Sequence, residues 1–104
     1  MKEQTVFGRQ LRKARTRAGL SQKQLGIEAG MDEFSASPRI NQYERGTHTP
    51  DYRTAQRLAA CLRVPVEYLY TDSETMAELI LLISELDEQK RHRLIEQLRS
   101  TSQT

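Results

Sequence analysis

The placement of glycine and proline is the feature of this sequence that most limits its fold. The three prolines stand at positions 38, 50 and 65, and Gly19, Gly30 and Gly46 each follow a run with helical spacing of apolar residues. No segment alternates apolar β-branched residues with polar ones, as a half-buried strand would. The pattern therefore predicts an all-α fold of short helices separated by turns.

The N-terminal half predicts three helices with recognisable start signals. Ser21 and Gln24 have the spacing of a capping box, in which each side chain bonds the other residue's N–H. Ser37 is expected to cap the third helix, with Pro38 in the first turn, where a missing N–H costs nothing. Residues 31–36 are expected to form a loop. The three helices are expected at residues 5–18, 22–29 and 38–45.

The C-terminal half predicts further helical segments and a boundary. Asp51 is the expected cap of a fourth helix, and residues 66–70 form a short fifth turn. Residues 71–73 are interpreted as a hinge, which divides the chain into a domain at 1–71 and an extension at 72–104. The extension is expected to be a helical hairpin, because Leu86 and Asp87 have the pattern of a staple and cap for a last helix.

The charge is divided unevenly along the chain. Residues 1–71 hold 12 Lys or Arg against 7 Asp or Glu, giving +5, whereas residues 72–104 hold 4 against 7, giving −3, and the sum is the net +2. A basic segment is expected of nucleic-acid binding, although Arg-rich helices also occur as ordinary solvated surfaces. The two parts are therefore expected to have different functions.

Several classes of function are disfavoured. The longest apolar run, residues 79–83, is too short to span a membrane, and the N-terminus lacks the apolar stretch of a signal peptide. Cys61 is the single cysteine, and His48 and His92 stand apart without a metal-ligand set. No catalytic triad or phosphate-binding glycine motif is present. We expect a cytoplasmic protein that is not an enzyme and has no cofactor, metal, membrane segment or small-molecule substrate.

The third expected helix has an unusually polar outer face. Ile40 and Tyr43 face inward together, so Arg39, Asn41, Gln42 and Arg45 face largely outward. Such a helix fits the DNA major groove, which is about 12 Å wide. Three motifs accompany it, FGRQLR at residues 7–12, GLSQKQLG at 19–26 and RINQYERG at 39–46. Over residues 6–70 the sequence resembles the phage-repressor and Cro-type helix-turn-helix family. The resemblance implies a five-helix domain in a bacterial or phage-encoded, nucleoid-associated regulator of transcription.

The resemblance also implies roles for individual residues, in a homodimer on double-stranded DNA with an inverted-repeat operator. Arg15 and Glu44 would form a structural ion pair between the first and third helices. Lys23 and other basic residues, Arg12, Lys13 and Arg53 among them, are further candidates for phosphate contact. The base-reading residues would be Ser37, Arg39, Asn41 and Gln42. The residues that position the domain on phosphate would be Gln22, Lys23, Arg45, Thr47 and His48.

One spacing departs from the family pattern. The inward-facing Ile usually lies about six residues after the glycine that ends the second helix, whereas Gly30 and Ile40 are ten apart. About four extra residues lengthen the turn, and the acidic Asp32 and Glu33 within it would repel phosphate if they faced DNA. We expect this loop to turn aside.

The extension has more apolar surface than one contact face needs. Five consecutive apolar residues at 79–83 cover most of the circumference of a helix. Their second face packs either on the domain itself or against a second copy, and we favour the homodimer. The alternative function is a protein-interaction module, an antitoxin or bridging factor, whose last helices bind an antirepressor or another protein partner. The expected interface residues are Met76, Leu79, Ile80, Leu82, Ile83, Leu94, Ile95 and Leu98.

Overall fold

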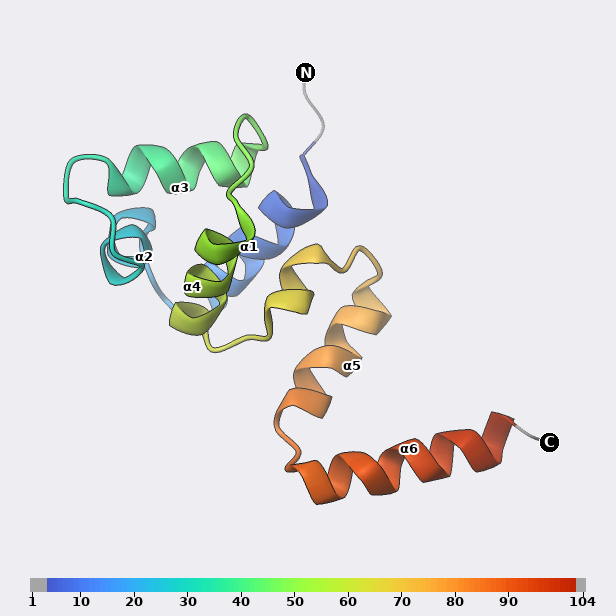
Figure 1. Cartoon of the computed structure of the whole chain (residues 1–104). Coiled ribbons are helices and arrows are strands. Elements are labelled where there is room, and N and C mark those ends of the chain that lie inside the picture. The colour runs from blue at the N-terminus through green and yellow to red at the C-terminus, as the bar shows by residue number, and fades with distance from the viewer. Residues whose placement is uncertain (1–3, 103–104) are drawn as a thin grey trace.

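The computed structural model describes residues 4–102 and is entirely helical over that range (Figure 1), which confirms the predicted all-α class. No strand occurs among these residues, and none of their helices has the length and apolar character needed to span a bilayer. Six α-helices and one 3₁₀ helix follow each other in the order α1 (Val6–Arg17), α2 (Gln22–Glu28), α3 (Ala36–Arg45), α4 (Tyr52–Leu62), η1 (Val66–Tyr70), α5 (Glu74–Ser84) and α6 (Glu88–Ser102).

Side-chain caps determine where most of these helices begin. The predicted capping box is present at α2, where the Gln24 N–H donates to Ser21 Oγ at 3.0 Å and the Ser21 N–H donates to Gln24 Oε1 at 2.8 Å. Asp51 accepts the Thr54 N–H at 2.8 Å and starts α4, as predicted. Each cap satisfies an N–H that the first helical turn leaves without a partner.

The prediction for the start of α3 is wrong by two residues. The helix begins at Ala36, and its capping residue Ser35 makes no side-chain cap bond. Asp32 organises the preceding turn instead, because its carboxylate accepts the Phe34 N–H at 2.8 Å and the Ser35 hydroxyl, and its carbonyl accepts the Ala36 N–H at 3.0 Å. Pro38 is the third helical residue, where its missing N–H still has no intrahelical partner to lose.

The core lies where α1 to α4 and η1 meet. Leu11, Leu25, Ile40, Leu58 and Leu69, from these five elements, are fully buried. Burying side chains of this size is the main source of stability in a domain this small. The core therefore holds α2 and α3, the two helices of the predicted helix-turn-helix, at a fixed angle on a support formed by α1 and α4.

The segment predicted as a hinge is held against α1. Arg9 donates to both the carboxylate and the carbonyl of Asp72, at 2.7 and 3.1 Å, and Gln10 donates to the carbonyl of Thr71 at 2.7 Å. Lys13 forms an ion pair with Glu74 at the start of α5. These contacts fix the direction in which α5 leaves the domain.

The extension contains the two predicted helices, joined by a short turn in which Asp87 caps α6 through the Lys90 N–H at 2.9 Å. The helices diverge as an open V (Figure 1), because Arg91 bonds the last carbonyls of α5, Ile83 at 3.2 Å and Ser84 at 3.1 Å, at the vertex. No residue of α6 is buried. The second helix of the pair therefore projects away from the domain.

Candidate nucleic-acid interface

A polar groove of about 570 Å³ lies where α1, α2 and α3 meet. Side chains from all three helices reach it, and two of them, Arg12 and Arg45, are exposed arginines that form no ion pair within residues 4–102. A groove bordered by unpaired arginines and amide side chains suits a polyanion with hydrogen-bonding edges. The lining residues are Gln4, Arg12, Arg15, Gln22, Asn41, Glu44 and Arg45.

An ion pair between Arg15 and Glu44 forms the floor of the groove. The guanidinium contacts the carboxylate through two bonds, at 2.5 and 3.0 Å, and also donates to the carbonyl of Leu20 at 3.0 Å. Only 15% of the Arg15 side chain and 5% of the Glu44 side chain are exposed. The hydrogen bond to Glu44 raises the pKa of Arg15. The pair connects α1 to α3 and orients the helix that would read DNA.

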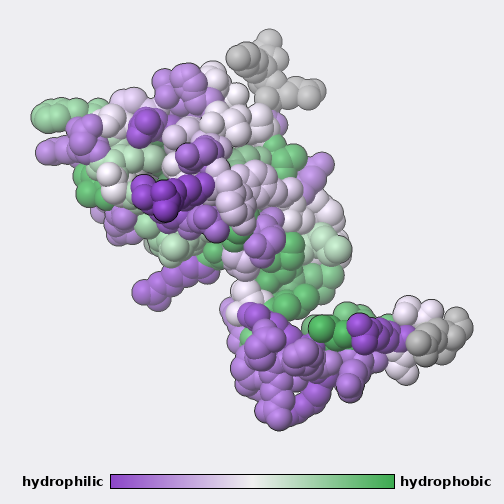
Figure 2. Space-filling view, in the orientation of Figure 1, coloured by the Kyte–Doolittle hydropathy of each residue, from purple (hydrophilic) through white to green (hydrophobic). Residues whose placement is uncertain are grey.

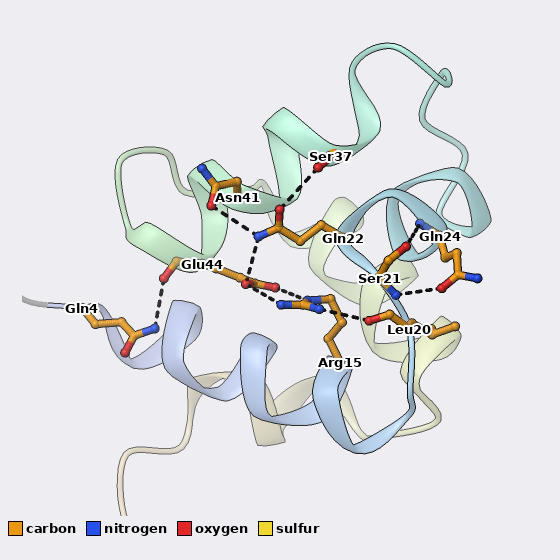
Figure 3. Close-up of polar contacts among 9 residues, drawn as sticks. All are labelled: Gln4, Arg15, Leu20, Ser21, Gln22, Gln24, Ser37, Asn41 and Glu44. Carbon is orange, nitrogen blue, oxygen red and sulfur yellow. Dashed lines mark hydrogen bonds and ion pairs between the residues drawn. The ribbon is translucent and has the colours of Figure 1, made fainter.

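Gln22, at the first position of α2, joins this pair to α3 (Figure 3). Its amide nitrogen donates to Glu44 Oε1 at 3.2 Å and to Asn41 Oδ1 at 3.3 Å, and its oxygen accepts the Ser37 hydroxyl at 3.3 Å. One side chain thus contacts three successive turns of α3. Figure 3 shows all four side chains directed into the space between the helices.

The structure separates the expected base-reading residues into two groups. Ser37 and Asn41 lie on one side of α3 together with Arg45, an expected phosphate contact, and Asn41 and Arg45 line the groove. Arg39 and Gln42 lie outside the groove lining. The pKa of the Asp32 carboxyl is lowered, mainly by the hydrogen bond from Ser35. Arg39 is exposed and lies close enough to Asp32 to contribute to this lowering.

The expected phosphate-contacting residues also have different surroundings. Lys23 pairs with Glu33 at 3.4 Å on the exposed surface. The Thr47 hydroxyl donates to the Gln42 carbonyl at 3.2 Å, and His48 Nδ1 lies 3.3 Å from Gln42 Oε1, so both residues fold back onto the end of α3.

Sequence reasoning missed two residues, one in the groove and one in the turn between α2 and α3. Gln4 lines the groove and donates to the Glu44 carbonyl at 3.2 Å, a contact between residues 40 positions apart that no local pattern indicates. Phe34, in the turn before α3, is 87% exposed, far more than a phenyl ring in a core would be. The signal for Phe34 was available, because it is the one aromatic residue in the extra segment of the turn.

The apolar residues expected to form an interface are largely exposed. Figure 2 shows apolar side chains gathered over α5 and along the edge of α6 nearer to it. Ile80, Ile83 and Leu94 are half-buried, and Ala77 alone in α5 is fully buried. The exposed members are Met76 at 55%, Leu79 at 46%, Leu82 at 55%, Ile95 at 43% and Leu98 at 58%.

Comparison with known proteins agrees with this geometry. Residues 6–69 match the family model described as a helix-turn-helix domain. The chain is 31% identical over 96 residues to a cryptic phage CTXphi transcriptional repressor, RstR, of Vibrio cholerae, covering 86% of this chain and 81% of that protein. The crystal structure of the transcriptional regulator BswR superposes with a TM-score of 0.82 at 50% identity, covering 89% of this chain and 92% of that one.

These relatives are regulators of transcription and not enzymes, and the match spans the groove, the ion pair and the capped helices described above. The chain belongs to the phage-repressor type of helix-turn-helix family and is a DNA-binding transcriptional regulator.

Proposed function

We propose that the protein is a repressor that binds an inverted-repeat operator as a homodimer, with α3 of each copy in a major groove. The observation that carries the proposal is the groove between α1, α2 and α3, in which Asn41 and Arg45 lie on the same side of α3 as Ser37. This stripe of polar side chains offers hydrogen-bonding groups at one-turn intervals, as reading base edges requires. That a similar protein is named a repressor supports repression over activation.

We assign two kinds of contact to the residues around the groove. Ser37, Arg39, Asn41 and Gln42 would read base edges, because all four are polar residues of α3 and none of them is buried. Lys23, Arg45, Thr47 and His48 would fix the position of the domain through phosphates, with Arg12 as an additional arginine that the groove exposes. Gln22 would position α3, because Glu44 and Asn41 already accept both of its side-chain N–H groups.

Dimerisation is proposed through α5 and α6. A soluble monomer seldom leaves several large apolar side chains of two neighbouring helices about half exposed, as Met76, Leu82 and Leu98 are here. A two-fold axis through this surface would bury it and would present two copies of α3 to successive major grooves, about 34 Å apart.

Selection of bound sequences from a random DNA pool, at about physiological salt, tests both parts of the proposal when light scattering follows on the recovered complex. We expect a two-fold symmetric consensus bound by two chains. Leu82→Asp should give single chains that keep the half-site preference and bind the full operator much more weakly. Thr75→Asp, which adds the same charge to an exposed polar position of α5, is the matched control and should remain dimeric.

The exposed apolar surface also favours a second candidate, a protein-interaction module in which α5 and α6 bind a partner protein. The two functions differ in their response to salt, because DNA binding weakens steeply as salt rises and an apolar helix interface does not. A monomer that selects no consensus DNA, and that retains a protein partner at high salt, would contradict the homodimeric repressor and support this module.

A further inference from the structure

Glu44 determines which group of the Gln22 side-chain amide donates and which accepts in the surrounding hydrogen bonds. A carboxylate can only accept, so the group of Gln22 that contacts Glu44 Oε1 at 3.2 Å must be its amide nitrogen. Arg15 donates to the same oxygen at 3.0 Å, and a carboxylate oxygen can accept both hydrogen bonds. The orientation of the Gln22 amide follows from the ion pair on the floor of the groove.

The oriented Gln22 amide in turn orients the side chains of Asn41 and Ser37 in α3. The Gln22 nitrogen has a second N–H, which meets Asn41 Oδ1 at 3.3 Å, so the Asn41 NH₂ group faces away from Gln22 (Figure 3). The Gln22 oxygen accepts the Ser37 hydroxyl at 3.3 Å, which uses the only hydrogen that this hydroxyl has. Asn41 is left with two donors, and Ser37 with an acceptor oxygen.

We infer that Gln22 determines the base preference of α3 by holding Asn41 as a donor and Ser37 as an acceptor, an inference that rests on the proposed operator binding. An unconstrained Asn reads adenine, because its oxygen and nitrogen match the N6 donor and N7 acceptor of that base. With its oxygen turned toward Gln22 and its NH₂ group facing away, Asn41 matches guanine, which offers the two acceptors N7 and O6. Gln22 is thus a positioning residue for specificity.

Adenine fits the oriented Asn41 poorly. Its N7 can accept one hydrogen bond, but its N6 amino group then faces the second N–H of Asn41, and both groups are donors. Losing one of two base contacts in this way corresponds to about tenfold in affinity. Ser37, in contrast, should prefer a base with an amino group in the major groove, which is cytosine or adenine.

The experiment is the random-pool selection repeated with three variants. Asn41→Ala identifies the base pair that Asn41 contacts, because the preference there is lost while the others remain. Gln22→Met keeps the length and packing of the side chain but removes its hydrogen bonds, so Asn41 is free to rotate. Gln56→Met, at an exposed position of α4 outside the network, is the matched control. The readout is the ratio of affinities for guanine and adenine at that base pair, which a uniform loss of phosphate binding does not change.

Asn41→Ala identifies one base pair, and at that base pair we expect the unaltered protein to prefer guanine. Its affinity for adenine there should be about tenfold lower. Gln22→Met should bring that ratio close to one, and Gln56→Met should leave it unchanged. Adenine or cytosine preferred by the unaltered protein, a ratio unchanged in Gln22→Met, or an Asn41→Ala variant with every preference intact would each overturn the inference. If the unaltered protein selects no consensus at all, the proposed operator binding fails and this inference fails with it.

Discussion

Gly26 is the position where α2 and α3 approach most closely, and Gly26→Ala is the sharpest test of their packing. A Cβ atom built on Gly26 would lie 2.6 Å from the Ala36 Cβ, 2.8 Å from its Cα and 3.0 Å from its carbonyl oxygen. Two of these three atoms belong to the backbone, so no side-chain rotation relieves the overlap. The substitution therefore forces the first turn of α3 away from α2.

Two effects of opposite sign decide the outcome. Alanine in a helix is more favourable than glycine by about 1 kcal/mol. Overpacking a buried contact costs about 1–3 kcal/mol, and a backbone overlap at this distance belongs at the upper end. We expect the free energy of unfolding to fall by about 2 kcal/mol net, measured by urea denaturation, with the melting temperature lower by about 10 °C. Affinity for DNA should fall as well, because the tilt of α3 changes.

The double variant Gly26→Ala with Ala36→Gly isolates the contact. Removing the Ala36 methyl eliminates the nearest overlap and leaves the two backbone contacts. Because Ala36→Gly has its own helix-propensity cost, it is measured alone as well, and the two substitutions should couple favourably by about 1 kcal/mol. Gly19→Ala provides the control, because Gly19 has a φ of +73° and open space around it, and its cost cannot depend on Ala36. If Gly26→Ala stabilised the protein by the roughly 1 kcal/mol that helix propensity alone predicts, the close approach of α2 and α3 would be refuted.

Three further predictions concern charge. Arg39→Ala should cost about 1–3 kcal/mol of operator affinity and relax specificity, whereas Arg45→Ala should weaken all DNA sequences alike and reduce the salt slope by about one; equal salt slopes for the two would contradict the assignment. Hydrogen bonds from Thr54 lower the pKa of Asp51, so the stability of its cap is present at neutral pH and is lost as the pH falls from about 4 through the lowered value. Asp51→Asn should therefore flatten the acid side of a stability profile, and an unchanged profile would argue against this role. Arg9→Ala removes two of the hydrogen bonds that hold the linker on α1 and should widen the range of half-site spacings that a dimer accepts, which binding to operators of varied spacing would show.

Most of the fold could be predicted because its signals are local. Ser21 and Asp51 stand next to the helices they cap, and Gly46 has the left-handed φ of +78° that lets a helix end there. The start of α3 could not be predicted in this way. Ser37 followed by Pro38 has the local pattern of a cap, but the contact between Gly26 and Ala36 and the turn around Asp32 extend the helix two residues further.

Most residues of the candidate site could be predicted, but only one of its connections. The resemblance to a known family pointed to Arg15 and Glu44 as an ion pair and to Gln22 and Asn41 individually. That Gln22 bonds Ser37, Asn41 and Glu44 at once depends on the angle at which α2 crosses α3, and the partners lie 15 to 22 positions away along the chain. Sequence spacing within one helix predicts which side chains share a face, but not which face a second helix meets.

The acidic extension forms ion pairs with basic residues of α1, and these pairs affect where positive charge remains on the domain. The acidic extension neutralises basic residues on one side of α1, since Asp72 pairs with Arg9 at 2.7 Å and Glu74 pairs with Lys13. Arg12, on the same helix, remains unpaired within the described residues and lines the groove. Because paired charges attract phosphate weakly, the ion pairs that fix α5 also concentrate the attraction for DNA on the groove side of the domain. The same acidic residues thus set the direction of the extension and favour the groove side as the face that would meet DNA in the proposed complex.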